Sequence, residues 1–238
     1  MQNLHICCHD YIFEVQAMEK KLQFFVAGLG RFGQSVALTL EKLGYDVMAM
    51  DSDEDVVQDL SDQLGYVVCA DATDEKNLAA IGAGNADVAV IGIGNIEGSL
   101  LATLQLKDMG VPLLVVKALN ELHGKMLEKI GADKIIYSEK EMGVRVAHNL
   151  TSPGIIDYIE MNNNITILTI QMPKDWIGKN LIQIDARRKY NINVVAVLRG
   201  TENMINPAPD MPMQEGDKVT ILGDSGNVRH VTEELEIE

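Results

Sequence analysis

The chain has 238 residues, of which 47% are hydrophobic, and its 35 acidic and 20 basic side chains give a formal net charge of −15. This length is enough for one large or two modest globular domains, and the negative charge argues against nucleic acid and anionic lipid as partners. No apolar run approaches the roughly 18 residues of a membrane-spanning helix, and no segment resembles a secretory signal.

The first residues do not predict a metal site, although two histidines and two adjacent cysteines lie between residues 5 and 9. Adjacent cysteines cannot easily bind one ion together, and no second ligand pair follows at zinc-finger spacing. The chain has 3 cysteines in all, which is no disulfide framework and is typical of a reducing cytosol. Because the first periodic strand starts at Leu22 and Met18 offers an alternative start, residues 1–19 are expected to be a poorly ordered extension.

Residues 20–150 alternate between short apolar runs and segments with helical periodicity. Strands that are apolar on both faces and joined by helices predict a parallel sheet covered on both faces, and right-handed crossovers favour a doubly wound, Rossmann-like α/β order. In the third helical segment we expect Thr73 at the N-cap. The expected strands are residues 22–28, 46–51, 66–71, 87–94, 112–118 and 134–137, and the expected helices are 31–44, 53–65, 71–82, 96–110, 121–132 and 139–150.

A break at residues 151–154 separates this region from a second, smaller α+β domain, which we place at residues 158–238. Residues 155–160 are interpreted as a short helix before the polar "MNNN". Within the second domain, the patterns predict strands at 165–173, 192–200 and 218–223, helices at 178–190 and 227–236, and a proline-rich loop at 205–217.

The motif "VAGLGRFGQS" places three glycines between a buried strand and a helix, and an acid, Asp51, ends the next strand. In this setting Gly28 makes the tight turn, Gly30 lets phosphates approach the backbone, and Gly33 allows close packing of helix on strand. The helix N-terminus attracts the anion, and Asp51 accepts hydrogen bonds from ribose hydroxyls. The motif therefore predicts a nucleotide site, and the acids of "DSDED" argue against a 2′-phosphate.

Arg31 follows the second glycine directly, where a cation opposes the helix dipole. It is tolerated there if it reaches solvent, and it becomes favourable if a phosphate chain extends beyond the pyrophosphate to meet the guanidinium. Because ATP and ADP have such a tail and NAD continues into a second ribose, Arg31 favours ATP or ADP. This argument alone leaves NAD or NADH open.

These residues, together with "ADATDEKNL", "VAVIGIGNIEGSLLATLQLKDMGV" and "VVKALNELHGKMLEKIGADKIIYSEKEMG", resemble the RCK (KTN) domain of the regulatory subunits of Ktr- and Trk-type potassium transporters. The resemblance covers nearly everything from residue 20 onward, including a small C-terminal RCK domain, and is closest to the single-RCK Ktr subunits. It implies an adenine-nucleotide site made by Gly28, Gly30, Arg31, Phe32, Gly33, Asp51, Asp71, Ala72, Thr73, Gly94, Asn95 and Lys117.

The resemblance also implies that Arg31 reaches the terminal phosphate and that Asp71, Ala72 and Thr73 border the adenine. Glu139 corresponds to a glutamate that takes part in binding Mg²⁺ or another divalent cation with ATP. Here serine replaces the family's proline before it, and Glu141 stands two residues on. Some family members bind cyclic di-AMP between C-terminal domains, and Arg187 and the "NPAP" turn lie in that stretch.

The implied function is that of a non-enzymatic gating subunit at the inner face of the cell membrane. It would control a separate integral membrane potassium-translocating subunit and assemble as dimers in an octameric ring. The helix at 139–150 offers Met142, Val146 and Leu150 either as a dimer face or as a face packed on its own sheet. The alternative is an NAD(H)-dependent oxidoreductase, against which stand the scattered histidines and the absence of a Tyr-x-x-x-Lys pair.

Overall fold

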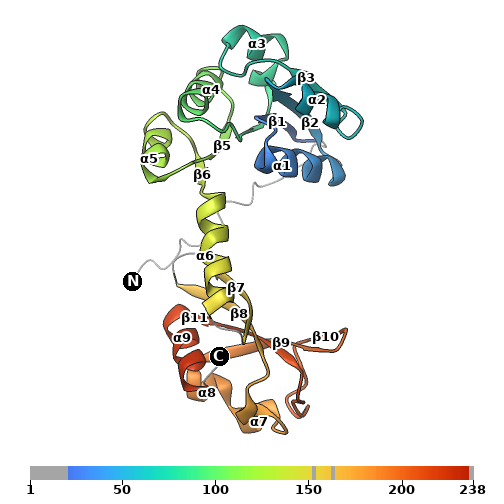
Figure 1. Cartoon of the computed structure of the whole chain (residues 1–238), viewed down its shortest axis with the longest axis vertical. Helices are drawn as coiled ribbons and strands as arrows, with labels where there is room; N and C mark the ends of the chain where they lie inside the picture. The colour runs from blue at the N-terminus through green and yellow to red at the C-terminus, as the bar shows by residue number, and fades with distance from the viewer. Residues whose placement is uncertain (1–20, 152–153, 162–163, 236–238) are drawn as a thin grey trace, which may run out of the picture. The chain divides into compact units, whose positions relative to one another are not determined.

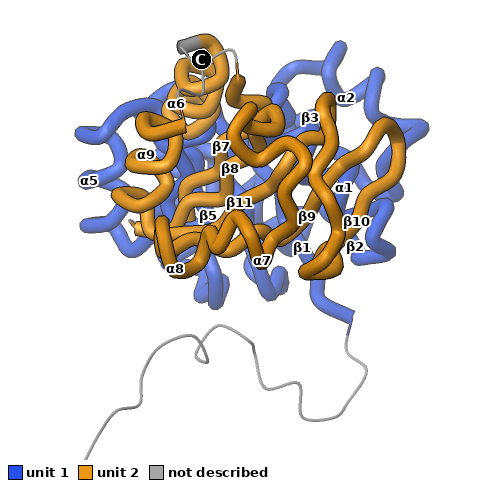
Figure 2. The backbone as a smooth tube through the Cα atoms, turned by 90° about the horizontal axis from the view of Figure 1, so that it is seen from below, with its two compact units in different colours: residues 1–138 blue, residues 139–238 orange. Residues whose placement is uncertain are grey.

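The computed structural model describes residues 21–151, 154–161 and 164–235, and the chain divides into two compact units at residues 138 and 139 (Figure 2). The extension expected at residues 1–19 lies outside the described residues. Each unit contains its own sheet and its own buried core, and the two units are described separately below.

The first unit is a six-stranded parallel sheet, as the sequence predicts, and its strand order is β3-β2-β1-β4-β5-β6 (Figure 1). Its strands are β1 (Gln23–Ala27), β2 (Asp46–Asp51), β3 (Tyr66–Cys69), β4 (Val88–Ile91), β5 (Leu113–Lys117) and β6 (Lys134–Ile136). Its helices are α1 (Arg31–Lys42), α2 (Glu54–Leu60), α3 (Glu75–Ala80), the 3-10 turn η1 (Ala83–Asn85), α4 (Ile96–Asp108) and α5 (Glu121–Lys129).

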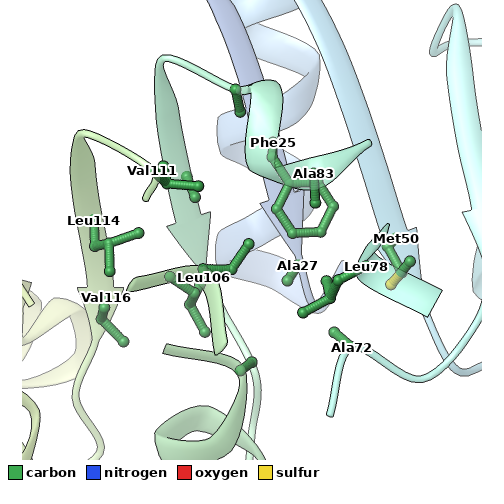
Figure 3. Close-up of a cluster of buried hydrophobic side chains, with 14 of the residues drawn as sticks. Phe25, Ala27, Met50, Ala72, Leu78, Ala83, Leu106, Val111, Leu114 and Val116 are labelled. Carbon is green, nitrogen blue, oxygen red and sulfur yellow. The ribbon is translucent and has the colours of Figure 1, made fainter. Parts of the chain in front are cut away.

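Both faces of this sheet are buried, which explains why its strands read as continuous apolar runs. Phe25 of β1 belongs to a cluster that includes Leu106 of α4, drawn in Figure 3. The next residue, Val26, points to the other face and belongs to a cluster with Ala37 of α1. Helices α1 and α2 therefore cover one face, and α3, α4 and α5 cover the other.

The second unit contains a five-stranded antiparallel sheet in the order β10-β9-β11-β8-β7. Its core lies between this sheet and α9, with Leu168, Ile221 and Val231 among the buried side chains. Helix α6 (Ser138–Thr151) precedes β7 (Ile155–Met161), β8 (Ile165–Gln171), η2 (Lys174–Trp176), α7 (Leu181–Ile184), α8 (Ala186–Tyr190), β9 (Ile192–Arg199), β10 (Glu202–Ile205), β11 (Lys218–Asp224) and α9 (Ser225–Glu234).

We expected a helix at residues 155–160, and this prediction is wrong. These residues belong to β7, which pairs with β8 in antiparallel register. Isoleucines at 155, 156 and 159 favour an extended backbone. The strand is also tied to α6, because Arg145 donates two hydrogen bonds to the carboxylate of Asp157 at 2.8 and 2.7 Å. Long-range pairing therefore decides this segment, rather than its local pattern.

The helix expected at 178–190 is broken into α7 and α8, because Asp185 takes a left-handed conformation with φ of 49°. Aspartate is one of the few residues that tolerate this region. Strand β10 is not predicted by the sequence; it is a short strand that pairs with β9 in a hairpin whose turn contains Gly200 at φ of 59°.

Candidate functional site

The loops that follow β1 to β5 meet at one edge of the parallel sheet, because the carboxyl ends of parallel strands point the same way. β1 lies between β2 and β4, so the strand order reverses there. Ligands of open α/β sheets bind outside the carboxyl ends of the strands at this reversal. The structure places every predicted site residue of the first unit at this edge, in residues 28–33, 51, 71–73, 94–95 and 117.

Two of the three glycines are required by the backbone itself. Gly28 has φ of +84°, and a Cβ there would lie 2.7 Å from the backbone nitrogen of Ile93. A Cβ on Gly33 would lie 1.9 Å from the carbonyl oxygen of Gly28, so α1 packs directly against the loop. Gly30 differs, since a Cβ there would meet nothing within 4 Å. This open space is what a bound phosphate group needs.

Helix α1 begins without a side-chain cap. Its N-cap residue is Gly30, no acidic residue stands in its first turn, and its first residue, Arg31, is exposed. The backbone N–H groups of that turn therefore keep their capacity to donate to an anion. Phe32 is half-buried and packs against the cluster on the α1 side of the sheet, so it anchors the first turn of α1 to the hydrophobic core.

Asp51 has a role that the sequence does not indicate. Its Oδ2 accepts a hydrogen bond from the backbone nitrogen of Leu29 at 2.5 Å, and its Oδ1 accepts one from Asp53 at 3.0 Å. The carboxylate therefore ties the glycine-rich loop to the end of β2. Each carboxylate oxygen has a second lone pair, so ribose hydroxyls can still donate to it.

The loop between β3 and α3 contains Asp71, Ala72 and Thr73. Both the backbone nitrogen and the hydroxyl of Thr73 donate to Asp71 Oδ1 at 2.8 Å, and these two hydrogen bonds lower the pKa of the Asp71 carboxyl. We expected Thr73 to be the N-cap of α3, and this prediction is wrong. Asp74 takes that position and accepts from the backbone nitrogen of Lys76, because the turn around Asp71 already uses the Thr73 hydroxyl. Ala72 is buried in the cluster of Figure 3.

Residues after β4 and β5 complete the edge. Gly94 and Asn95 are exposed, and Asn95 caps α4 by accepting from the backbone nitrogen of Gly98 at 2.7 Å. Lys117 is half-buried at the end of β5. A further contact, which no local sequence pattern indicates, comes from Gln105 of α4, which donates to the carbonyl oxygen of Thr73.

Glu139 follows the end of β6 by three residues. It is an exposed residue in the first turn of α6 and belongs to the second unit. Within the described ranges, no three His, Cys, Asp or Glu side chains group together as a metal site. The His and Cys residues between positions 5 and 9 lie outside these ranges.

Met142, Val146 and Leu150 of α6 are all exposed, by 54%, 46% and 78% of their surface. Within the described chain they are thus available for contact with another chain and are not packed on a sheet. In the part of the chain that the structure describes, no helix is long and apolar enough to cross a membrane.

Comparisons with known proteins agree with this architecture. The TrkA-N domain model matches residues 24–138, and the TrkA-C domain model matches residues 165–236. Ktr system potassium uptake protein C of Bacillus subtilis is 40% identical over 204 residues, covering 85% of this chain and 92% of that protein. Ktr system potassium uptake protein A of the same species is 35% identical over 216 residues, covering 90% of this chain and 97% of that protein.

Among solved structures, the RCK domain of GsuK matches 94% of this chain and 48% of that chain, with a TM-score of 0.52 and 21% identity. At this identity the likeness supports the fold alone. The two Ktr proteins have higher sequence identity to this chain, and the matches cover nearly their full length. The chain therefore belongs to the family of Ktr-type potassium uptake proteins, in which a TrkA-N domain is followed by a TrkA-C domain.

Proposed function

We propose that this chain is a non-enzymatic regulatory subunit that binds an adenine nucleotide and thereby controls potassium flux through a separate membrane subunit. The observation that carries the proposal is the edge at β1 and β4, where an open glycine turn, an uncapped helix N-terminus and the Asp51 carboxylate come together. The relatives named as potassium uptake proteins support the regulatory role.

Each part of an adenine nucleotide has a place at this edge. Phosphates fit over Gly30, where the N–H groups of the first turn of α1 are available. Ribose hydroxyls can donate to Asp51. The ionised carboxylate of Asp71 can accept from the exocyclic amino group of adenine, whereas guanine has a carbonyl oxygen at that position. Gly94, Asn95 and Lys117 would line the other side of the nucleotide.

Arg31 favours ATP or ADP over a dinucleotide. It is exposed at the first position of α1, where its charge opposes the helix dipole and an anion beyond the pyrophosphate would give it a favourable partner. NAD or NADH stays the alternative ligand, and the GsuK channel, which matches this fold with a TM-score of 0.51, has been solved bound to NAD. NADPH should not bind, because Asp53, Glu54 and Asp55 are exposed next to Asp51.

The alternative function, an NAD(H)-dependent oxidoreductase, requires an accessible acid or base beside the nicotinamide. His123, at the start of α5, is fully buried, and this burial lowers the pKa of its imidazole. It is therefore kept neutral and away from solvent, which is unfavourable for a group that must exchange protons with a substrate.

Two further ligands belong to the proposal. Mg²⁺ or another divalent cation would bind with ATP and involve Glu139, and Glu139→Gln should then reduce the dependence of ATP affinity on Mg²⁺. Cyclic di-AMP would bind the second unit near Arg187, which is exposed on α8, and near the turn that begins at Asn206 with φ of 51°. Arg187→Ala should then weaken cyclic di-AMP and leave ATP unchanged.

As assembly, we propose a homo-oligomer of dimers, an octameric ring at the inner face of the membrane, with the exposed apolar side of α6 in the dimer contact. The measurement is native mass spectrometry of the full chain. A monomer at working concentration, with and without nucleotide, would overturn this assembly.

The nucleotide proposal is tested by calorimetric titration of the full chain with ATP, ADP, NADH and NADPH. We expect ATP and ADP to bind with micromolar or better affinity and NADPH not to bind. NADPH binding as tight as ATP would overturn the ribose assignment, and NADH binding tighter than both ATP and ADP would favour the oxidoreductase. In proteoliposomes with the membrane subunit, flux that does not respond to the chain or its nucleotide would overturn the regulatory role.

A further inference from the structure

The loop at residues 71–73 is held mostly by hydrogen bonds from its own neighbourhood. The two bonds from Thr73 to Asp71 are local, and the carbonyl oxygen of Asp71 accepts from Asn77 Nδ2 at 3.0 Å. One bond is different in kind. Gln105 Nε2 donates to the carbonyl oxygen of Thr73 at 2.6 Å, across 32 residues of sequence. Among the described residues, no other hydrogen bond reaches residues 71–73 from outside residues 71–77.

The oxygen of the Gln105 side-chain amide is not satisfied by a hydrogen bond within the described ranges. Its Oε1 is buried and has no hydrogen-bond partner among the residues that the structure describes. A buried acceptor without a partner destabilises the folded state, and an apolar side chain of similar size would avoid this cost. The useful contact of this side chain is therefore its bond to Thr73.

Helix α4 is a rigid support for that contact. Asn95 caps its first turn, and it runs to Asp108. Its residue Leu106 is fully buried in the cluster that also contains Ala72, and Figure 3 shows the two side chains in the same cluster. Helix α4 and the loop thus belong to the same buried core, and the Gln105 bond joins α4 to the Thr73 carbonyl oxygen directly.

We propose that Gln105 is a positioning residue for adenine recognition, which acts by orienting residues 71–73 and does not touch the phosphates. This inference rests on the proposed function, because that function places the adenine at these residues. A loop free to rotate its Thr73 peptide would present the Asp71 carboxylate to the base less often, while the glycine turn and α1 would be unaffected.

The test compares full-length Gln105→Leu and Gln105→Glu with wild type in titrations with ATP and with inorganic tripolyphosphate. Leucine has no donor, and glutamate has none when it is ionised, so neither replacement can donate to the Thr73 carbonyl oxygen at a pH where the glutamate is charged. We expect ATP affinity to fall about 3- to 12-fold, as for one lost hydrogen bond, and tripolyphosphate affinity to stay within about twofold. Thr103→Val is the matched control, because Thr103 is buried on the same helix and its hydroxyl bonds only within α4, to the carbonyl oxygen of Ser99.

Hydrogen exchange of the unliganded protein gives a second readout that needs no nucleotide. Faster exchange at residues 72–77 in both Gln105 variants, and not in Thr103→Val, is expected. Unchanged ATP affinity, parallel loss of ATP and tripolyphosphate, or an equal selective loss in Thr103→Val would each overturn the inference. Failure of wild type to bind ATP would instead overturn the proposed function, and unchanged exchange in the Gln105 variants would then also exclude the positioning role.

Discussion

Replacing Asp51 by asparagine should destabilise the first unit as well as weaken nucleotide binding. Both carboxylate oxygens accept backbone hydrogen bonds, one from Leu29 in the glycine-rich loop at 2.5 Å and one from Asp53 at 3.0 Å. An asparagine has one oxygen, so its NH₂ group must face one of these two N–H donors. One hydrogen bond to a charged acceptor is lost, and the other is made to a neutral acceptor.

A hydrogen bond to a charged group contributes about 1.5–3 kcal/mol, so we expect Asp51→Asn to lower the free energy of unfolding of the first unit by about 2 kcal/mol. ATP affinity should fall by a further 1–3 kcal/mol, roughly 5- to 150-fold, because the ribose loses a charged acceptor. The measurements are urea unfolding of the unliganded chain and calorimetric titration with ATP.

Asp53→Asn is the matched control, because it removes the same charge two residues away. Asp53 caps α2 by accepting from the backbone nitrogen of Asp55 at 3.0 Å, and asparagine is an equally good N-cap. We expect this variant to unfold within about 0.5 kcal/mol of wild type. Equal urea midpoints for Asp51→Asn and Asp53→Asn would refute the role of Asp51 in holding the loop.

Three more variants test other parts of the structure. Arg31→Ala should weaken ATP by about 1.5–3 kcal/mol and AMP hardly at all, with stability unchanged or slightly higher, and equal losses for both nucleotides in calorimetry would contradict this. Gly33→Ala should destabilise the first unit by about 3 kcal/mol or more in urea unfolding, because its Cβ would lie 1.9 Å from a backbone oxygen, whereas Gly30→Ala, with open space around it, should keep the fold and lose nucleotide affinity. The pKa of Asp217 is lowered chiefly by its hydrogen bond to Arg199, so this carboxylate stabilises the second unit above its unfolded pKa of about 3.9 and the contribution is lost as pH falls through the lower folded value. Asp217→Asn should therefore lower the free energy of unfolding by about 3 kcal/mol at pH 7, near the low end for a buried ion pair because Arg199 is 29% exposed. If the extra stability of wild type over this variant did not shrink below about pH 4, the result would contradict this.

The sequence predicts well what local pattern determines. Apolar runs of strand length, helical periodicity and glycines with a steric reason are all properties of neighbouring residues, and they suffice for the six-stranded sheet and the glycine turn. The crowding around Gly33 shows why, since no other residue fits between helix and loop. The position of the site follows from strand order, which the right-handed crossover rule restricts to few choices.

What the sequence does not predict depends on partners far along the chain. Residues 155–160 have no strong alternation, and their strand exists because β8 pairs with them and Arg145 holds Asp157. The second role of Asp51 joins residues 22 apart, and the bond of Gln105 joins residues 32 apart. Neither contact alters the local hydrophobic pattern. The N-cap at Asp74 was missed for a different reason, because Thr73 and Asp74 both have side chains suited to that position.

If ATP and ADP set different transport states, the difference must come from the terminal phosphate. In the proposed site, the base and ribose contacts at Asp71 and Asp51 would be the same for ATP and ADP, so these contacts cannot make the two nucleotides favour different states. Arg31 lies at the exposed start of α1, beyond the turn that would hold the first phosphates. In the proposed site, the contacts that would give affinity are thus separate from the contact that would discriminate ATP from ADP. A variant without Arg31 should keep adenine and ribose recognition, and potassium flux with ATP and with ADP should become alike.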